Sequence, residues 1–203
     1  GLFAAISENF YLGFVVLFAL AYGAPNSQVG LLAAGANLLG AVALFPGARL
    51  IEKVGRRKPV VVWSGGIFGR FFLLCLALIP LFIADPAVAI LAIIIIDSLR
   101  AFSFNLANPA WTSMVADIVP ESMRARYFSN RNIAMGIAAL AIAPLAGWII
   151  SRANLRLDSP YIGYQIVFLF AFLFGLVSTA SFAKIKEPVS SETQQGEHHR
   201  GDL

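Results

Sequence analysis

Four charged side chains fall inside long apolar stretches of the sequence. They are Glu8, Arg70, Asp97 and Arg100. A charge at the centre of a membrane-spanning helix costs about 2.5–3.5 kcal/mol on insertion scales, so we expect these groups to face a cavity or one another. Two acids and two bases permit neutral pairing, and Asp97 and Arg100, three residues apart, share a helix face. Such acids are candidate proton carriers, and an arginine there can hold an anion. The structural alternative is an ion-pair cluster without turnover.

The elements that carry these charges are predicted to be membrane-spanning helices. Hydrophobic residues make up 59% of 203 positions, charged residues only 13%, and the mean hydropathy is +0.78. Six apolar runs are each long enough to cross about 30 Å of hydrocarbon. They lack the two-residue alternation of barrel strands, so only helices satisfy their backbone groups. The expected spans are residues 1–22, 27–48, 60–83, 85–116, 128–151 and 159–183.

The basic residues are divided unevenly between the loops. Residues 49–59 carry five Lys or Arg, residues 117–127 carry two and the tail from residue 184 carries three, whereas the opposite side has only Arg152 and Arg156. Ten against two predicts that the first three segments lie in the cytoplasm. Because topology explains the net charge of +4, we expect no nucleic-acid partner.

Nothing in the sequence predicts an enzyme, a cofactor or a metal site. The single cysteine, Cys75, lies in an apolar run and offers neither a disulfide nor a cysteine metal site. His198 and His199 belong to a polar tail, residues 187–203, that we expect to be a disordered cytoplasmic linker with solvated histidines. No nucleophile with a matching base and no phosphate loop is recognisable.

The most basic loop has a recognisable arrangement. Glu52 lies three residues before Gly55, which Arg56 and Arg57 follow directly. This arrangement resembles the signature loop between the second and third helices of the major facilitator superfamily (MFS), with Glu52 in place of the usual Asp and Ala48 in place of the first Gly. Gly55 permits a tight turn, and the arginines can clamp carboxylates. A plain basic turn on the cytoplasmic side is the alternative.

A second segment resembles the same family. Asp117, Pro120 and Arg124 follow the pattern found after the fourth helix in many of its members. The resemblance implies a cytoplasmic gating network in which Asp117 lies near Arg56 and Glu52 lies near a complementary half. An exposed ion pair contributes only about 0–1 kcal/mol, so its effect would be to bias a nearly balanced equilibrium. Ordinary charges at a helix end are the alternative.

Two residues of the fifth span match part of a further family element. Pro144 and Gly147 resemble a motif of the superfamily's drug/proton antiporters, from which Ala143 and Trp148 depart. A helix kink with close packing explains the pair without antiport, and we adopt that interpretation.

The resemblance also gives the buried charges a role. The first and fourth helices usually line the central cavity in this superfamily, which implies that Glu8, Asp97, Arg100 and the nearby Asn105 face substrate or proton. Asp97 falls where the family's fourth-helix motif has an Arg, so the role of that Arg is not transferred. Arg70 falls on the usually peripheral third helix, and we expect it to turn inward and pair with an acid.

The sequence therefore predicts an all-α membrane protein whose six transmembrane helices, over residues 1–186, form an MFS-type bundle of two three-helix inverted repeats. The resemblance implies the amino-terminal half of a secondary active transporter that works by alternating access, driven by protons, in the cytoplasmic membrane of a bacterium. Its partners would be the lipid bilayer, an unidentified small-molecule substrate, protons, and a second six-helix half in the same chain or a partner chain. The alternative is a six-helix scaffold without transport, or a half-transporter acting as a homodimer.

Overall fold

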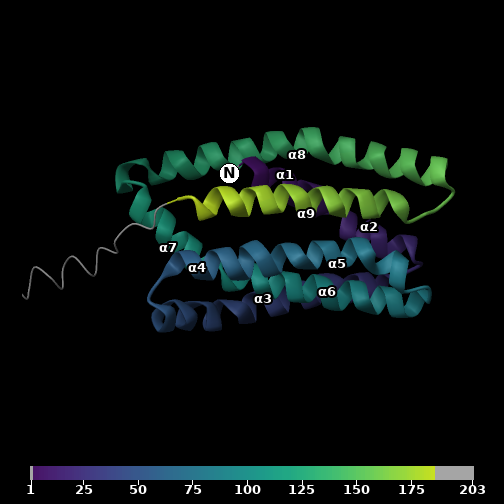
Figure 1. Ribbon diagram of the computed structural model, residues 1–203, viewed down its shortest axis with the longest axis horizontal. Helices are drawn as coiled ribbons and strands as arrows, with labels where there is room; N and C mark the ends of the chain where they lie inside the picture. The colour runs from purple at the N-terminus through teal and green to yellow at the C-terminus, as the bar shows by residue number, and fades with distance from the viewer. Residues whose placement is uncertain (1, 186–203) are drawn as a thin grey trace, which may run out of the picture.

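The computed structural model describes residues 2–185, so the predicted tail with His198 and His199 lies outside the described part. Within that part the chain is helical and has no strand. Six helical segments are long and apolar enough to cross a membrane, which confirms the predicted fold class (Figure 1). Their bounds are Leu2–Ala21, Asn26–Val54, Arg57–Phe82, Pro86–Ile118, Glu121–Leu157 and Ile162–Ala183.

The first and fourth spans are each broken into two helices. The first consists of α1 (Leu2–Tyr11) and α2 (Phe14–Ala21), separated at Gly13, whose φ of 90° favours glycine. The fourth consists of α6 (Pro86–Leu106) and α7 (Asn108–Ile118), which meet just before Pro109. Proline removes a backbone donor and restricts the residue before it, so a break is expected there. The sequence predicted the two spans but not these interruptions.

The second and fifth spans are single long helices. They are α3 (Asn26–Val54), with 29 residues, and α8 (Glu121–Leu157), with 37. At about 1.5 Å per residue, α8 is longer than the roughly 30 Å hydrocarbon layer, so it must extend beyond the apolar run from which its span was predicted. Each helix contains an internal proline and remains helical through it.

One packing prediction in α8 is wrong for the described chain. A Cβ built at Gly147 meets no other group within 4 Å, so no neighbouring helix packs closely there. The adjacent Ala146 is completely buried instead. The helix therefore presents Ala146 to its neighbours and leaves Gly147 on its open face.

The third span changes helical type along its length. It begins as α4 (Arg57–Val60), continues as the π-helix η1 (Val61–Phe68) and ends as α5 (Gly69–Phe82). The sixth span is the single helix α9 (Ile162–Ala183). The third span was predicted from the sequence, but its π-helical section was not.

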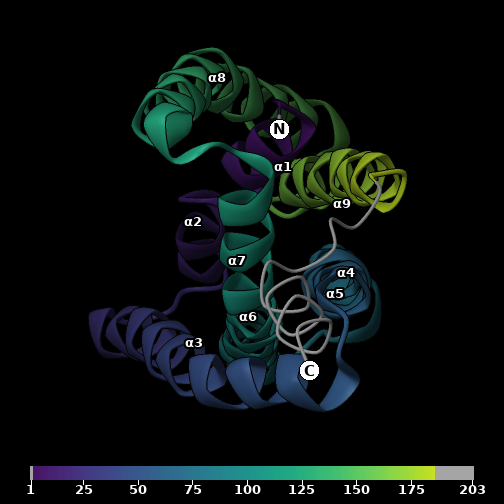
Figure 2. The same cartoon turned by 90° about the vertical axis from the view of Figure 1, so that its left-hand side faces the viewer.

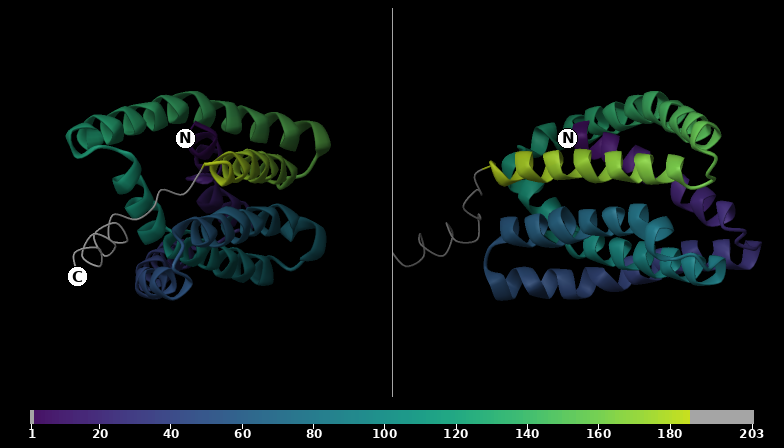
Figure 3. Two further views of the ribbon diagram at one scale, coloured as in Figure 1. Left: turned by 60° about the vertical axis from the view of Figure 1, so that its left-hand side comes forward. Right: turned by 45° about the vertical axis from the view of Figure 1, so that its right-hand side comes forward.

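Helices of each three-span unit pack on helices of the other unit. Helix α3, from the first three-span unit, packs on α6, whereas α8, from the second unit, packs on α1. Likewise α5 packs on α6 and α9 packs on α1, and α5 also contacts α9. Viewed from the end, α3 and α8 lie at opposite edges with α6 and α7 between them (Figure 2), and the oblique views show α8 running along the outside of α1 and α9 (Figure 3). This reciprocal pairing is the pattern expected of two three-helix inverted repeats.

Small residues allow α3 to approach α6 closely. A Cβ at Gly47 would lie 2.5 Å from the carbonyl oxygen of Leu106, and one at Gly40 would lie 2.8 Å from Nδ2 of Asn105. Ala43, between the two glycines, is completely buried. Close approach through small residues is a usual basis of helix association in membranes. It fixes the position of α6, which carries Asp97 and Arg100.

The apolar core fills the space between α1, α2, α5, α6 and α9. Its largest fully buried side chains include Phe18, Leu73, Leu76, Ile93 and Phe168. The charged residues lie in the same interior, on the faces of α1, α5 and α6 that point toward one another. The core therefore holds three helices rigidly around one polar cluster.

Candidate functional site

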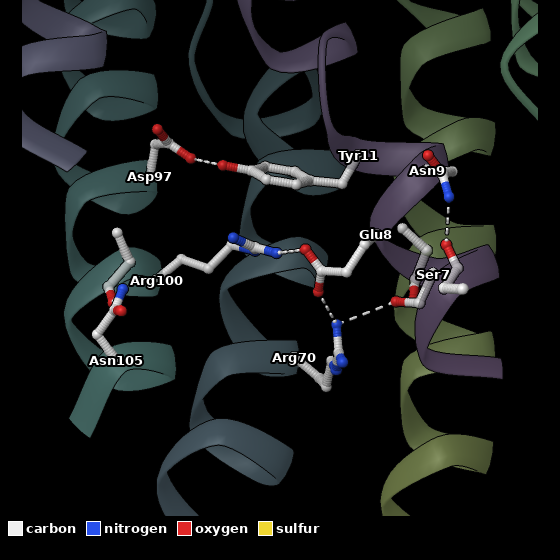
Figure 4. Close-up of polar contacts among 11 residues, drawn as sticks. Ser7, Glu8, Asn9, Tyr11, Arg70, Asp97, Arg100 and Asn105 are labelled. Carbon is white, nitrogen blue, oxygen red and sulfur yellow. Dashed lines mark hydrogen bonds and ion pairs between the residues drawn. The ribbon is translucent and has the colours of Figure 1, made fainter. Parts of the chain in front are cut away.

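Glu8 lies between two arginines from different helices (Figure 4). Its Oε1 accepts a hydrogen bond from Nη1 of Arg70 at 2.6 Å, and its Oε2 accepts one from Nη2 of Arg100 at 2.6 Å. The arginine side chains are only 5% and 7% exposed. Charge-assisted bonds of this kind are the strong ones, so a single carboxylate ties α1 to both α5 and α6. Arg70 does turn inward to an acid, as expected.

Asp97 has a different partner. The hydroxyl of Tyr11 donates a hydrogen bond to its Oδ1, and Asp97 is only 3% exposed. The guanidinium carbon of Arg100 lies 3.6 Å from the centre of the Tyr11 ring, within the range of a cation–π contact. Tyr11 thus joins the two halves of the cluster, with its hydroxyl on one acid and its ring against the arginine that pairs with the other (Figure 4).

The cluster continues to the backbone of α9. Nη1 of Arg70 also donates to Oγ of Ser7 at 3.1 Å, and this hydroxyl donates to the carbonyl oxygen of Ala171 at 2.6 Å. A Cβ at Gly175 would lie 2.8 Å from Nε of Arg70 and 3.0 Å from the Ser7 hydroxyl. Only glycine leaves the arginine room against α9.

An aromatic ring lies against both arginines. The guanidinium carbons of Arg70 and Arg100 lie 5.5 and 5.7 Å from the centre of the Phe104 ring. Sequence reasoning missed Phe104, together with Tyr11 and Ser7. Helical spacing carries a signal for two of them, because Tyr11 lies three residues after Glu8 and Phe104 lies four residues after Arg100.

Some hydrogen-bonding capacity in the cluster is unused. Among the described residues, Nε of Arg70 and Nε of Arg100 are buried without a partner. Buried polar atoms of this kind are uncommon in folded proteins. The two arginines therefore retain donors that a rearranged cluster or a bound acceptor could engage.

Asn105 does not join the charges, although it was expected to face the same space. Its Nδ2 donates to the carbonyl oxygen of Ala101, one turn earlier in α6, at 2.9 Å. The same amide lies against Gly40 of α3. Asn105 therefore belongs to the interface between α3 and α6 and makes no contact with the cluster (Figure 4).

The predicted gating residues lie at the basic end of the bundle. There α3 is followed by α4, and α7 is followed by α8. Arg57 forms an ion pair with Asp117, and both side chains are about one-fifth exposed, at 18% and 20%. Arg56 was expected to lie near Asp117, but the pair is made by the next residue, while Arg56 and Glu52 are exposed. Gly55 ends α3 with a φ of 66°, the tight turn that the sequence predicted.

Arg124 has a local role at this end. Its Nη2 donates to the carbonyl oxygen of Ala116 at 2.7 Å, and its Nε donates to that of Val119 at 3.2 Å. The last carbonyls of a helix have no intrahelical partner, so these bonds cap α7. In the described chain Arg124 caps α7, and its place in the predicted gating network stays a prediction.

The described residues contain no cluster of three His, Cys, Asp or Glu side chains that could hold a metal ion. The polar groups of the interior are instead carboxylates, guanidiniums and hydroxyls, which can exchange protons and bind anions or hydrogen-bonding solutes.

Fold and site together define a polytopic membrane protein whose helices enclose an ion-pair cluster. Comparison with protein families identifies the family of this protein. The model of the Major Facilitator Superfamily matches residues 1–201. The chain belongs to this superfamily of membrane transporters, and its six spans correspond to the amino-terminal half of such a transporter. Comparisons with curated proteins and with solved structures gave no match.

Proposed function

We propose that the chain is part of a secondary active transporter that moves a small molecule by alternating access and couples this movement to protons. The observation that supports the proposal best is the convergence of Glu8, Asp97, Arg70 and Arg100 from three spans into one buried cluster. Ionisable residues inside a membrane are expensive, and in transporters they mark ion and substrate pathways.

The two acids have different roles in this proposal. Protonation of Glu8 would disrupt ion pairs with two arginines, whereas Asp97 receives a hydrogen bond from the neutral hydroxyl of Tyr11. Asp97 can therefore gain or lose a proton with less disruption of the surrounding bonds. We assign Asp97 the role of proton carrier and Glu8 the role of holding both arginines in place.

Alternating access requires a second half that moves against this one. Helices α3 and α8 are the least buried of the six spans in the described chain, and they lie at opposite edges of the bundle (Figure 2). Large apolar side chains such as Phe45 and Leu140 are about four-fifths exposed on them, at 79% and 80%. These surfaces suit a second six-helix half, in the same chain or a partner chain, with lipid around the remainder.

The Arg57–Asp117 pair fits the same mechanism. It joins α4 to α7 at the basic end, where movement of the halves would open or close the cavity. Because an exposed pair is weak, it can bias the equilibrium between conformations without locking one of them. The basic loops further support an orientation with this end in the cytoplasm. The membrane in this proposal is the cytoplasmic membrane of a bacterium.

Proton movement in proteoliposomes tests the proposal. Vesicles loaded with a pH-sensitive dye are given sugars, amino acids, organic anions and cationic drugs in turn, and we expect one class to move protons. Asp97→Asn should abolish this coupled signal, whereas Asp158→Asn, on an exposed loop residue, should preserve it. Retained coupling in Asp97→Asn would contradict the assigned role. No proton movement with any class would favour the alternative of a scaffold without transport.

A further inference from the structure

A mainly apolar cavity with a few polar side chains lies between the charge cluster and the basic end of the bundle. It is a partly open cavity of about 200 Å³ bounded by α1, η1, the junction of α6 and α7, α8 and α9. Its lining includes Arg70, Arg131, Asn108, Thr179, Trp111 and Phe182. Arg70 is the only residue it shares with the ion pairs of Glu8.

The backbone is irregular on two sides of this cavity. One side is the π-helix η1, and another is the break between α6 and α7 at Ala107. A Cβ at Gly65 would lie 2.9 Å from Cβ of Ala107, and one at Gly66 would lie 2.5 Å from a methyl group of Thr179. Within a membrane such irregular backbone is tolerated where it is buried in protein or lines a cavity, and π-helical turns are frequent at functional sites.

The charged groups that line the cavity are all cationic among the described residues. They are the guanidinium groups of Arg131 and Arg70, and Arg70 also pairs with Glu8, which does not line the cavity. Arg70 is only 4% exposed, and its Nε has no hydrogen-bond partner among the described residues. Arg131 lies with its guanidinium carbon 4.9 Å from the centre of the Trp111 ring, which fixes its position on the cavity wall. An anion is the complement of this lining, because guanidinium groups bind carboxylates in a fork.

The volume of the cavity and the side chains that line it indicate which anions could bind. A cavity of about 150 Å³ lined by apolar side chains is large enough for benzene, so 200 Å³ accommodates a six-membered ring with a carboxylate. Phe104, Trp111 and Phe182 supply aromatic surface beside the two cations. We propose that this cavity is a binding site for a small aromatic monocarboxylate of about the size of benzoate, with its carboxylate on Arg131 and Arg70 and its ring among these aromatic side chains. This site does not depend on the proposed proton coupling.

Fluorine NMR of the full chain in lipid nanodiscs tests the site with benzoate as the probe. Labelling with 5-fluorotryptophan reports on Trp63, Trp111 and Trp148, and Trp111→Phe assigns the signal in the cavity. Trp63 and Trp148 are 58% and 59% exposed on the outside of the bundle, so they report on partition into the lipid. We expect benzoate to shift the Trp111 signal saturably and to leave the other two unchanged.

Matched ligands and variants separate the site from nonspecific effects. Benzylamine, with a cation in place of the carboxylate, should not saturate the Trp111 shift, and benzyl alcohol should bind much more weakly. Arg131→Gln should weaken benzoate binding about tenfold, as the loss of a charge-assisted hydrogen bond predicts, while Arg131→Lys should retain part of it. Equal binding of benzoate and benzyl alcohol, parallel shifts of all three signals, or unchanged affinity in Arg131→Gln would overturn the proposal.

Discussion

Glu8 compensates two buried guanidiniums at once, so its removal should affect stability more than that of any exposed acid. Glu8→Gln keeps the size of the side chain but leaves Arg70 and Arg100 without an anion. Breaking a buried ion pair from one side typically costs about 3–5 kcal/mol, and we expect a loss of this order in the free energy of unfolding. Unfolding in a denaturing detergent titration measures it.

The matched control for this variant is Glu52→Gln. Glu52 is exposed on the basic loop, and substitutions at such positions usually change the unfolding free energy by less than about 0.5 kcal/mol. Equal stability of the two variants would show that Glu8 does not hold the arginines. Glu8→Asp, which restores the charge on a shorter side chain, should recover part of the loss.

Tyr11 can be tested without removing its ring. Tyr11→Phe deletes the hydroxyl that Asp97 accepts from, but it leaves an aromatic face beside Arg100. A buried acceptor that loses its donor typically destabilises a protein by about 1–3 kcal/mol, and we expect that effect in the same detergent titration. Tyr127→Phe, on a residue that is 41% exposed, is the control and should be neutral. Equal free energies of unfolding for the two variants would show that the Tyr11–Asp97 hydrogen bond does not stabilise the fold.

At the level of residues, the sequence located the charged groups but not all of their contacts. Charge inside an apolar run is visible directly, and its cost requires pairing, so the inward turn of Arg70 could be predicted. Which acid receives which arginine depends on the rotation of each helix about its axis, and neighbouring positions in sequence do not fix it. Asp117 shows the same limit, since a shift of one residue decides between Arg56 and Arg57.

At the level of elements, the closest contact of the cluster is with a glycine of α9. Gly175→Ala would place a methyl group 2.8 Å from Nε of Arg70, so either the arginine or α9 must move. We expect lower thermal stability, although alanine is the better helix former by up to about 1 kcal/mol. The control is Gly136→Ala in α8, where a Cβ meets nothing within 4 Å and should be neutral or stabilising. A stabilised Gly175→Ala variant would show that this approach is not tight.

The link between α4 and α7 is a separate element-scale feature. Arg57→Gln removes the ion pair with Asp117 while leaving the turn at Gly55 intact. Because exposed pairs contribute about 0–1 kcal/mol, hydrogen exchange over residues 108–118 should become faster by no more than about fivefold. Arg56→Gln removes an equal charge from an exposed position and should leave this exchange unchanged. Equal effects of both variants would indicate a general response to loop charge.

The helix breaks show how much of the elements the sequence could predict. Six apolar runs predict six spans, and the end of α3 follows from Gly55. The break before Pro109 had a signal, because a residue before proline is biased away from the helix. Gly13 had almost none, since an isolated glycine in an apolar run is usually tolerated in a helix. The sequence did not predict the π-helix. Its Gly65 and Gly66 lie close to Ala107, between α6 and α7, and to Thr179 of α9, and these contacts are visible only in three dimensions.

For the whole molecule, the reciprocal pairing of the two three-span units gives the bundle its arrangement. The middle helix of each unit packs on a helix of the other unit, α3 on α6 and α8 on α1, although α8 also packs on α9 of its own unit. The sequence predicted the number of spans and the repeat, but not that α3 and α8 remain the least buried helices. The buried fraction of a helix depends on which helices pack against it. The sequence does not show this, because all six spans have a similar apolar composition.

The orientation of the bundle is a property of the whole chain and can be tested without changing its charges. In a Cys75→Ser background, Ser122→Cys places a single exposed cysteine at the start of α8, and Ala84→Cys places one between α5 and α6. The start of α8 and the connection from α5 to α6 lie at opposite ends of the bundle (Figure 1). The excess of Lys and Arg predicts that the Ser122 end faces the cytoplasm. A membrane-impermeant maleimide applied to intact cells should therefore label Ala84→Cys and spare Ser122→Cys, and inverted vesicles should reverse the result. Labelling of Ser122→Cys in intact cells would place the Arg57–Asp117 pair on the outer side, where it could not act as a cytoplasmic gate.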